Sequence, residues 1–286
     1  MTELNIYVPR NKEDSKCWQV FNPFMLGWDD ETHVEYDYVQ HGGISMFWGL
    51  VGKNSEMIKK HEAEFRPYLF SDMPYFGRWS GLKEALDPDS DFYWRICPNR
   101  MHSHFQKTEA QTLSSDRFDR HNTPIKEKKK RGHEIILCPS SESVTRHLCN
   151  CSVETWINDT TAAIREYTDR PIRVRHKPRR NGTSGPAAAL IPFAEDIKDA
   201  WCVITLISMS GTEALLNGVP MMETEHINGY SNFRFQPDKI ESVEWSGYGT
   251  QVLMNWLAYQ QFTPKEMYTG EALAILKETN PYFFSE

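Results

Sequence analysis

Residues 200–222 constrain the fold more than any other part of the chain. An apolar run, 201–207, is followed by a turn of small residues, a stretch with helical character, Gly218 and a second apolar run, 219–222. Two short strands joined by a helix form a βαβ unit, whose strands lie parallel in one sheet. Glycine at the end of the helical stretch is the residue that most often stops a helix.

Similar apolar, β-branched or aromatic runs alternate with helical patterns along the whole chain. They predict strands at residues 4–8, 34–39, 68–71, 92–96, 134–138, 172–176, 201–207 and 219–222. This alternation is typical of an α/β protein built from βαβ units around parallel sheets. We find no internal repeat in the sequence.

The most polar interval, residues 106–131, divides the chain. It contains almost no apolar residue and ends in the charged run 126–131. Such a segment predicts a linker or mobile loop, and a solvated surface run explains its charges better than nucleic-acid contact. A boundary near Pro124 separates an N-terminal lobe, residues 1–124, from a C-terminal lobe, residues 125–286.

Start signals and apolar stripes predict three helices in the C-terminal half. Ser152 is placed to cap a helix with the stripe Trp156, Thr160, Ala163, Ile164 and Tyr167. Thr263, followed by Pro264 and Glu266, has the pattern of a capping box. An apolar stripe over 252–257 precedes it, so the chain is predicted to end in two helices.

Composition excludes several classes of protein. The chain of 286 residues has 40% hydrophobic and 25% charged residues, which is ordinary for a globular protein. Its net charge of -7 argues against a surface that coats nucleic acid, although a local basic cleft stays open. No apolar run has the about 18 residues that span a bilayer. The start of the chain also lacks a signal peptide, so we expect a cytoplasmic protein without a membrane partner.

The cysteines predict free thiols and no metal site. Six cysteines are scattered along the chain, unlike the dense framework of a small secreted domain. Cys138, His147, Cys149 and Cys151 include possible zinc ligands, but Cys-x-Cys without a second matching pair is poor spacing for a structural zinc site.

The turn after the apolar run 201–207 has the residues of a phosphate site. Ser208, Ser210 and Gly211 are small, so backbone N–H groups can approach a ligand, and the first turn of a helix leaves N–H groups partly positive. Glu213 in that first turn could accept hydrogen bonds from a ribose diol. The alternative is that Ser208, Ser210 and Thr212 only cap the helix while Gly211 eases the turn.

A basic strand favours the phosphate interpretation. Alternate side chains of a strand share a face, so Arg173, Arg175 and Lys177 are predicted to point one way while Ile172 and Val174 face the core. Three like charges on one face repel, but they are useful opposite a diphosphate, which arginine binds through a bidentate fork and lysine as a point charge.

Three motifs together resemble the donor-binding segment of glycosyltransferases with the GT-B fold: Asp199-Ala200 before the apolar run, Ser210-Gly-Thr-Glu213-Ala-Leu, and Gly218-Val-Pro220. The resemblance implies an α/β fold of two Rossmann-like lobes facing a central cleft, with C-terminal helices closing the fold.

The resemblance also implies roles for single residues. Arg173, Arg175 and Lys177 would neutralise a leaving diphosphate, the amides of residues 210–212 would hold phosphate, and Glu213 would bind ribose or the sugar. The co-substrate would be a nucleotide sugar, with a UDP-sugar favoured, and no other cofactor is expected. The same motif pairing occurs in epimerases of this fold.

The chain as a whole is similar to a group of tailed-phage proteins, through segments 72–78, 168–175 and 257–263. This likeness points to phage enzymes that glycosylate hydroxymethylated bases such as hydroxymethylcytosine. It implies a DNA acceptor and the host cytoplasm.

The N-terminal lobe must then supply the acceptor site. Asp72 ends a predicted strand, where α/β sheets place ligands, and is the predicted general base, although it could instead stabilise the turn that follows. Gly42 and Gly43 follow the predicted strand 34–39 and resemble a loop that approaches the donor diphosphate, or they form a tight turn. Tyr75 and Arg78 could stack on an extruded base, or belong to the core.

The leading interpretation is a glycosyltransferase that moves a hexose or pentose from a nucleoside diphosphate to a hydroxyl, with a modified DNA base as the favoured acceptor. The enzymatic alternatives are a nucleotide-sugar epimerase and a transferase acting on a polysaccharide, which the acidic charge of the chain suits better. A non-enzymatic alternative is a protein that only binds a nucleotide or nucleic acid.

Overall fold

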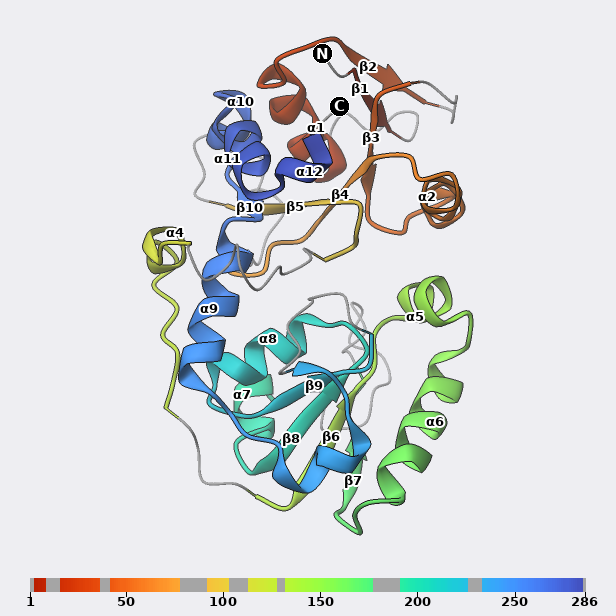
Figure 1. The fold of residues 1–286 in the computed structure, drawn as a ribbon, viewed down its shortest axis with the longest axis vertical. Coiled ribbons are helices and arrows are strands. Elements are labelled where there is room, and N and C mark those ends of the chain that lie inside the picture. The colour runs from red at the N-terminus through yellow and green to blue at the C-terminus, as the bar shows by residue number, and fades with distance from the viewer. Residues whose placement is uncertain are drawn as a thin grey trace. The chain divides into compact units, whose positions relative to one another are not determined.

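The computed structural model describes residues 3–8, 16–36, 42–77, 92–102, 113–127, 132–176, 191–225 and 233–284. Within these residues the chain forms two β-sheets with helices around them, and each sheet belongs to its own compact unit (Figure 1). The first unit comprises Met1–His104, Thr112–His121 and Asn255–Glu286, and the second is built mainly on Asn122–Met254. The predicted α/β fold class is confirmed.

The first sheet has six strands in the order β10-β5-β4-β3-β1-β2. The first four strands of the chain run parallel, whereas β5 is antiparallel to β4 and β10 is antiparallel to β5. The strands are β1 (Leu4–Tyr7), β2 (Thr32–Glu35), β3 (Ile44–Trp48), β4 (Tyr68–Asp72), β5 (Trp94–Pro98) and β10 (Gln261–Phe262). Helix α1 (Lys16–Leu26) connects β1 to β2, and α2 (Asn54–Ala63) connects β3 to β4.

The second sheet has four parallel strands in the order β7-β6-β8-β9. They are β6 (Glu134–Cys138), β7 (Ile172–Val174), β8 (Ala200–Thr205) and β9 (Met221–Glu223). The connecting helices are α5 (Glu142–Cys149) and α6 (Val153–Arg165) after β6, α7 (Phe193–Asp196) before β8, and α8 (Met209–Leu216) before β9. The chain moves first to one side of β6 and then to the other, so the strand order reverses between β6 and β8.

The strand predictions are confirmed best in the second sheet, where β6 has the predicted bounds. Two strands of the first sheet were not predicted. β3 is buried and carries the fully buried polar residue Ser45, which weakens its apolar signal, and β10 has only two residues. The expectation of parallel sheets is wrong for β5 and β10, which pair antiparallel. Apolar runs predict strands but not the direction in which neighbouring strands run.

The predicted helix starts are confirmed. Ser152 Oγ accepts the Thr155 N–H at 3.0 Å, and Thr263 and Glu266 form a reciprocal capping box. The chain ends in more helices than the two predicted, because Gly270, with a φ of 79°, separates α10 from α11. The final elements are the 3-10 helix Pro237–Ser242, α9 (Gly247–Ala258), α10 (Pro264–Tyr268), α11 (Glu271–Thr279) and α12 (Pro281–Phe284).

The polar interval is not a linker throughout. Its described part contains the short helix α4 (Asp116–Asp119), in which Arg117 and Phe118 are buried. Arg117 forms a 2.8 Å ion pair with Glu266, and the Phe118 ring lies edge-on to Phe76. A charged residue can therefore belong to the interior when a distant segment supplies its partner, which composition alone does not reveal.

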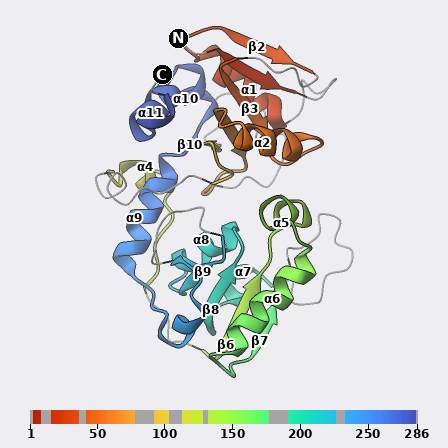
Figure 2. The same ribbon diagram turned by 45° about the vertical axis from the view of Figure 1, so that its right-hand side comes forward.

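Helices α10, α11 and α12 belong to the first unit, although the prediction placed them in the C-terminal lobe, whereas most of α9 belongs to the second unit. Met267, Leu273 and Leu276 share a buried cluster with Leu4 and Ile6 of β1. Helix α10 packs on α1, and Figure 2 shows α10 and α11 beside the first sheet. The predicted boundary near Pro124 is close to Asn122, where the main segment of the second unit begins.

Phe65 occupies an unfavourable position after α2. Its φ is 55°, in the left-handed region, and its side chain is 96% exposed. The Arg66 N–H donates to His61 O at 2.8 Å, which is the hydrogen bond of a helix end that favours glycine at position 65. No burial of the ring offsets the backbone strain.

We expect Phe65→Gly to stabilise the protein. Relief of left-handed strain contributes about 1–2 kcal/mol and the added freedom of unfolded glycine costs about 0.5–1 kcal/mol, so the net gain is about 1 kcal/mol. Urea unfolding measures the difference. Phe65→Ala, which removes the ring but keeps the strain, is the control, and a glycine variant less stable than the alanine variant would contradict the prediction.

Candidate functional site

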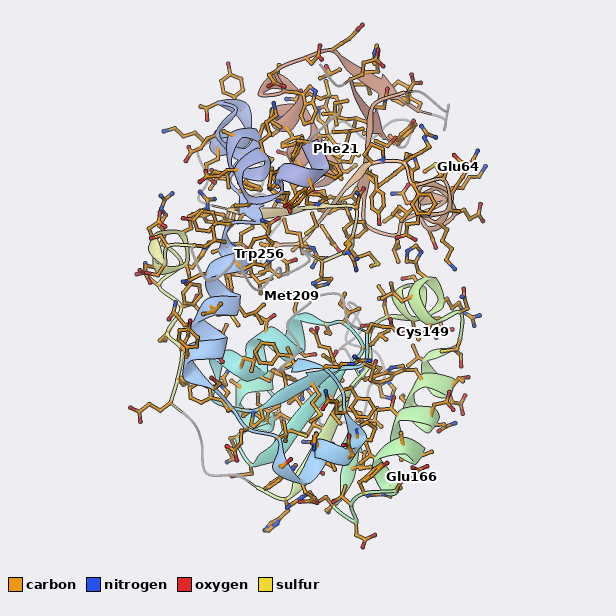
Figure 3. All side chains as sticks on the ribbon, in the orientation of Figure 1. Phe21, Glu64, Cys149, Glu166, Met209 and Trp256 are labelled. Carbon is orange, nitrogen blue, oxygen red and sulfur yellow. The ribbon has the colours of Figure 1, made fainter. Side chains whose placement is uncertain are left out.

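The second sheet places the predicted phosphate turn where its strand order reverses. The loops after β6 and β8 are joined there by Ser140, whose Oγ donates to Ile207 O at 2.7 Å. Helix α8 begins two residues after Ile207, at Met209, which Figure 3 labels. Open parallel sheets bind ligands outside the carboxyl ends of their strands at such a reversal. The location therefore agrees with a nucleotide site.

All five predicted turn residues lie at the start of α8. Ser208 is the N-cap, with φ −147° and ψ 147°, and its Oγ accepts the Ser210 N–H at 3.3 Å. Ser208 thus caps the helix, whereas the Ser210 hydroxyl, which the capping alternative also named, is buried without a hydrogen-bond partner in the described part of the chain. Capping by Ser208 is compatible with a phosphate at this turn, because further N–H groups at the start of a helix have no partner within it. Thr212 is buried. Glu213 is exposed, but it follows the first turn of α8, which contains no acidic residue, so its predicted place in the first turn is wrong.

Gly211 packs tightly against the sheet. A Cβ at this position would lie 3.2 Å from Thr205 Cγ2 and 3.4 Å from the Met221 side chain. The glycine therefore lets α8 approach β8 and β9 closely, as the packing glycine of dinucleotide sites does.

Ser210 lies near Cys138, the last residue of β6, and its Oγ is buried without a hydrogen-bond partner among the described residues. Burial raises the pKa of the Cys138 thiol to about 12 because it disfavours the thiolate, while nearby Ser210 and Arg175 act in the opposite direction. Cys138 is thus an inert thiol beneath the turn.

The predicted alternation of the basic strand is confirmed, since Ile172 and Val174 pack against the core of the second unit. Arg173 Nε donates to Glu134 at 2.8 Å, and its Nη1 donates to Asp196 at 3.1 Å. Arg175 donates to the same Asp196 carboxylate and to Ile191 O. Lys177 lies outside the described residues.

The two arginines are therefore paired with carboxylates of their own unit. Two guanidinium groups face two carboxylates, so the cluster is locally neutral. Burial acts to lower the pKa of Arg173, but the hydrogen bonds and charges of Glu134 and Asp196 outweigh it and raise the pKa. The counter-ion Asp196 lies 21 residues after Arg175, too far along the sequence to be recognised as its partner. For Arg173 and Arg175 to neutralise a diphosphate, a phosphate group would have to replace Asp196 as their partner.

In the first unit, Asp72 lies at the carboxyl end of β4, as predicted. Its Oδ2 accepts from Arg95 Nη2 at 2.9 Å, and its Oδ1 accepts the Met73 N–H at 2.7 Å. The Asp72 side chain is 34% exposed, whereas Arg95 is buried. The carboxylate is thus fixed by two donors and still meets solvent.

Gly42 and Gly43 directly precede β3 and lie at the amino ends of the strands. Asn5 Nδ2 donates to Gly42 O at 2.6 Å. Gly43 has a φ of 77°, and a Cβ there would lie 2.3 Å from Glu3 O. The left-handed φ and the close packing against Glu3 explain Gly43 as part of a tight turn, whereas a Cβ at Gly42 would meet nothing within 4 Å among the described residues.

Tyr75 is a core residue. Its side chain is 5% exposed, its hydroxyl lies 3.4 Å from Cys97 Sγ, and its N–H donates to Gln261 Oε1 at 2.7 Å. The structure thus favours the core alternative over base stacking for Tyr75. Arg78 lies outside the described residues.

The sequence reasoning overlooked the loop after β3. Gly49 and Gly52 have φ values of 51° and 60°, and Asn54 Nδ2 donates to Trp48 O at 2.8 Å. The loop leads into α2 at the carboxyl edge of the first sheet, next to the point between β1 and β3 where the strand order reverses. Two glycines between an apolar run and a helix were the available signal.

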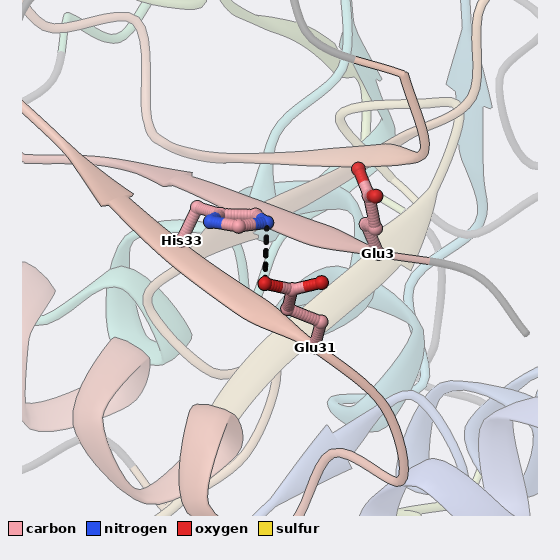
Figure 4. Close-up of side chains that lie close together, drawn as sticks. All are labelled: Glu3, Glu31 and His33. Atoms are coloured by element: carbon pink, nitrogen blue, oxygen red, sulfur yellow. Dashed lines mark ion pairs between the residues drawn. The ribbon is translucent and has the colours of Figure 1, made fainter.

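One group in the described part of the chain has the spacing of metal ligands. Ligand atoms of Glu3, Glu31 and His33 lie within 4.8 Å of one another, and His33 Nε2 is 3.7 Å from Glu31 Oε1 (Figure 4). The register of β1 and β2 brings these residues together at the amino ends of the strands, away from the edge that carries Asp72. All six cysteines are free, as predicted.

No protein-family model matches the sequence, and no curated protein matches it significantly. Two matching solved structures are of KpsC from Thermosulfurimonas dismutans. The beta Kdo 2,4 transferase is 11% identical, with 88% of this chain and 89% of that chain covered and a TM-score of 0.49. The beta Kdo 2,7 transferase is 11% identical, with 95% and 99% covered and a TM-score of 0.44. Because these identities and TM-scores are low, the α/β fold assignment rests on the strand order and connections described above.

Among the described residues, no helix has the length and apolar character to cross a membrane.

We expect Asp196→Asn to destabilise the protein by about 3 kcal/mol, because two guanidinium groups lose their shared, buried counter-ion. Glu134→Gln is the matched control. Glu134 pairs with the same Arg173 but is more exposed, so its loss should cost less than about 1 kcal/mol. Urea unfolding compares the two variants. Equal losses would show that Asp196 is not the principal counter-ion.

Proposed function

We propose that the protein is a glycosyltransferase whose second unit binds a nucleoside diphosphate sugar, with a UDP-sugar as the first candidate. The observation that supports the proposal is the position of the turn 208–213 at the strand-order reversal of a parallel sheet. This is the place where α/β sheets bind nucleotides. The motif resemblance to GT-B enzymes adds sugar transfer to nucleotide binding.

In this proposal the start of α8 holds the donor phosphate. The Ser208 cap orients the first turn, Gly211 brings the helix close to β8, and the helix dipole contributes roughly half a positive charge at its N-terminus. Glu213 is an exposed carboxylate just after that turn and is assigned to a sugar or ribose hydroxyl. Arg173 and Arg175 hold α7 on the sheet and act on phosphate only if Asp196 is displaced.

Asp72 of the first unit is the proposed general base. In a direct displacement it takes the proton of the acceptor hydroxyl while the acceptor oxygen bonds to the anomeric carbon of the sugar. The bond from that carbon to the phosphate oxygen breaks, and its electron pair leaves with the nucleoside diphosphate. Each Asp72 oxygen accepts one protein hydrogen bond, which leaves a second lone pair for the hydroxyl.

The acceptor is proposed to be a hydroxyl, and two classes of molecule can supply it. The likeness to phage proteins suggests a hydroxymethylated base in DNA, whereas the net charge of -7 suits a polysaccharide better. The burial of Tyr75 removes one support for base stacking.

A charge placed at the N-cap tests the donor site. Aspartate and asparagine both cap helices as well as serine does, so Ser208→Asp and Ser208→Asn should fold equally well. Only the aspartate repels a phosphate at the helix start. We expect UDP to bind Ser208→Asp at least about tenfold more weakly than Ser208→Asn. Calorimetric titration measures both affinities, and equal values would remove the phosphate from this turn.

Turnover assays separate the possible activities. The protein is incubated with UDP-glucose and either hydroxymethylated DNA, unmodified DNA or an oligosaccharide, and the products are weighed by mass spectrometry. A hexose mass gained by an acceptor, with release of UDP, supports transfer. A changed sugar that remains on UDP indicates an epimerase. Binding without a product indicates a nucleotide-binding protein, and no binding of any nucleoside diphosphate rejects both enzymatic functions.

A further inference from the structure

The first unit contains two arginine–carboxylate pairs in which the arginine is buried, and they differ in how far the carboxylate is exposed to solvent. Arg117 pairs with Glu266 at 2.8 Å, and both side chains are at least nine-tenths buried. Arg95 pairs with Asp72 at 2.9 Å, but here only the arginine is buried. The comparison separates a pair that holds the fold together from one with another role.

In the Arg117 pair, every guanidinium nitrogen donates a hydrogen bond within the protein. Its Nε donates to Ala258 O, its Nη1 to Glu266 and its Nη2 to Gln261 O, and all three acceptors belong to the C-terminal segment. Every nitrogen of the guanidinium is bound to a part of the chain more than 100 residues away. The pair therefore joins α4 to the C-terminal elements.

In the Arg95 pair, the Asp72 carboxylate is partly exposed to solvent. Arg95 is already a register partner of Asp72 in adjacent strands, so the ion pair joins no new segments. The guanidinium has two further neighbours. Its Nη1 lies 3.0 Å from His102 Nε2, and its Cζ lies 5.3 Å from the centre of the Tyr75 ring. Burial acts to lower the pKa of Arg95, but the charge of Asp72 and further groups outweigh it and raise the pKa. The carboxylate faces outward at the carboxyl edge of the sheet.

Such a pair is costly for stability alone. Burying a guanidinium removes it from water, and the ion pair offsets that loss only when the geometry is excellent and the remaining N–H donors also find partners. Arg95 Nε is buried without a hydrogen-bond partner within the residues that the structure describes. Arg95 is enclosed and Asp72 is not. What the arrangement provides is a carboxylate held in one orientation while its remaining lone pairs stay accessible.

We infer that Arg95 is a positioning residue for Asp72, with His102 holding Arg95 in place, and that this assembly binds the hydroxyl of the acceptor. The inference rests on the proposed function. Arg95 aims the Asp72 oxygen at the hydroxyl, and the ordering of a reacting group is worth large factors in rate. Donor affinity should be insensitive to Arg95, because its guanidinium is buried and its described contacts are with Asp72, His102 and Tyr75.

The test measures release of UDP from UDP-glucose with water as the acceptor. We expect Arg95→Met to lower kcat about 100-fold, which is the effect of a misplaced catalytic group, while KM for UDP-glucose changes less than about twofold. Arg95→Lys should recover part of the rate, since its ammonium can reach Asp72 as a point charge. The double variant Asp72→Asn with Arg95→Met should be no slower than Asp72→Asn alone, because residues that act as a unit are not additive.

Arg117→Met is the matched control. It breaks the other buried pair of the same unit, so it should lower the urea midpoint, yet the folded variant should keep its kcat. Retention of kcat by Arg95→Met while Asp72→Asn is inactive would overturn the inference, as would an equal loss of kcat in Arg117→Met.

Stability decides the inference even if the wild-type protein releases no UDP, a result that would count against the proposed function alone. Loss of one charge should lower the urea midpoint in Asp72→Asn and in Arg95→Met, whereas loss of both should restore it to the wild-type value or above. A double variant less stable than either single variant would show that the pair holds the fold together, and would overturn the positioning role.

Discussion

The first unit depends on a hydrophobic core that its own N-terminal residues cannot complete. Strands β1, β3 and β4 bury Leu4, Ile6, Met46 and Leu69 against α1, but the same cluster includes Phe262, Met267 and Leu276 from the end of the chain. A mostly parallel sheet must be covered on both faces. The sheet therefore stays incompletely covered until residues 255–286 return to it, and the first unit is discontinuous in sequence for this reason.

The same return orders the polar centre around Asp72. Gln261 of β10 pairs with Arg95 in the sheet, and its Oε1 accepts the N–H groups of Tyr75 and Phe76. Its backbone oxygen accepts from Arg117. One residue of the C-terminal segment thus ties α4, the turn after Asp72 and the edge strand together. The turn after Asp72 is held by the Gln261 side chain, whereas Arg117 contacts only the Gln261 backbone oxygen.

Local signals predicted local structure. Ser152 and Thr263 cap helices because the necessary groups lie within three residues of each other, and the turn 208–213 follows β8 because small residues, a cap and an apolar run are adjacent in the sequence. Pairings between distant segments were missed. Asp196 as the counter-ion of Arg175 is decided by how α7 packs, and the placement of Gly43 against Glu3 is decided by the register of β1 and β3. Neither is encoded within a short window.

Electrostatics distinguishes the two candidate sites. In the second unit Arg175 and Asp196 are both buried and cancel, so the charge offered at the turn comes from the partly positive start of α8. In the first unit the buried Arg95 and the half-open Asp72 leave a carboxylate accessible. An anionic phosphate is favoured at the first of these and repelled at the second, whereas a neutral hydroxyl that must lose a proton is favoured beside the carboxylate. The division of labour proposed for the two units therefore follows from which member of each ion pair is exposed, and not from the number of basic residues.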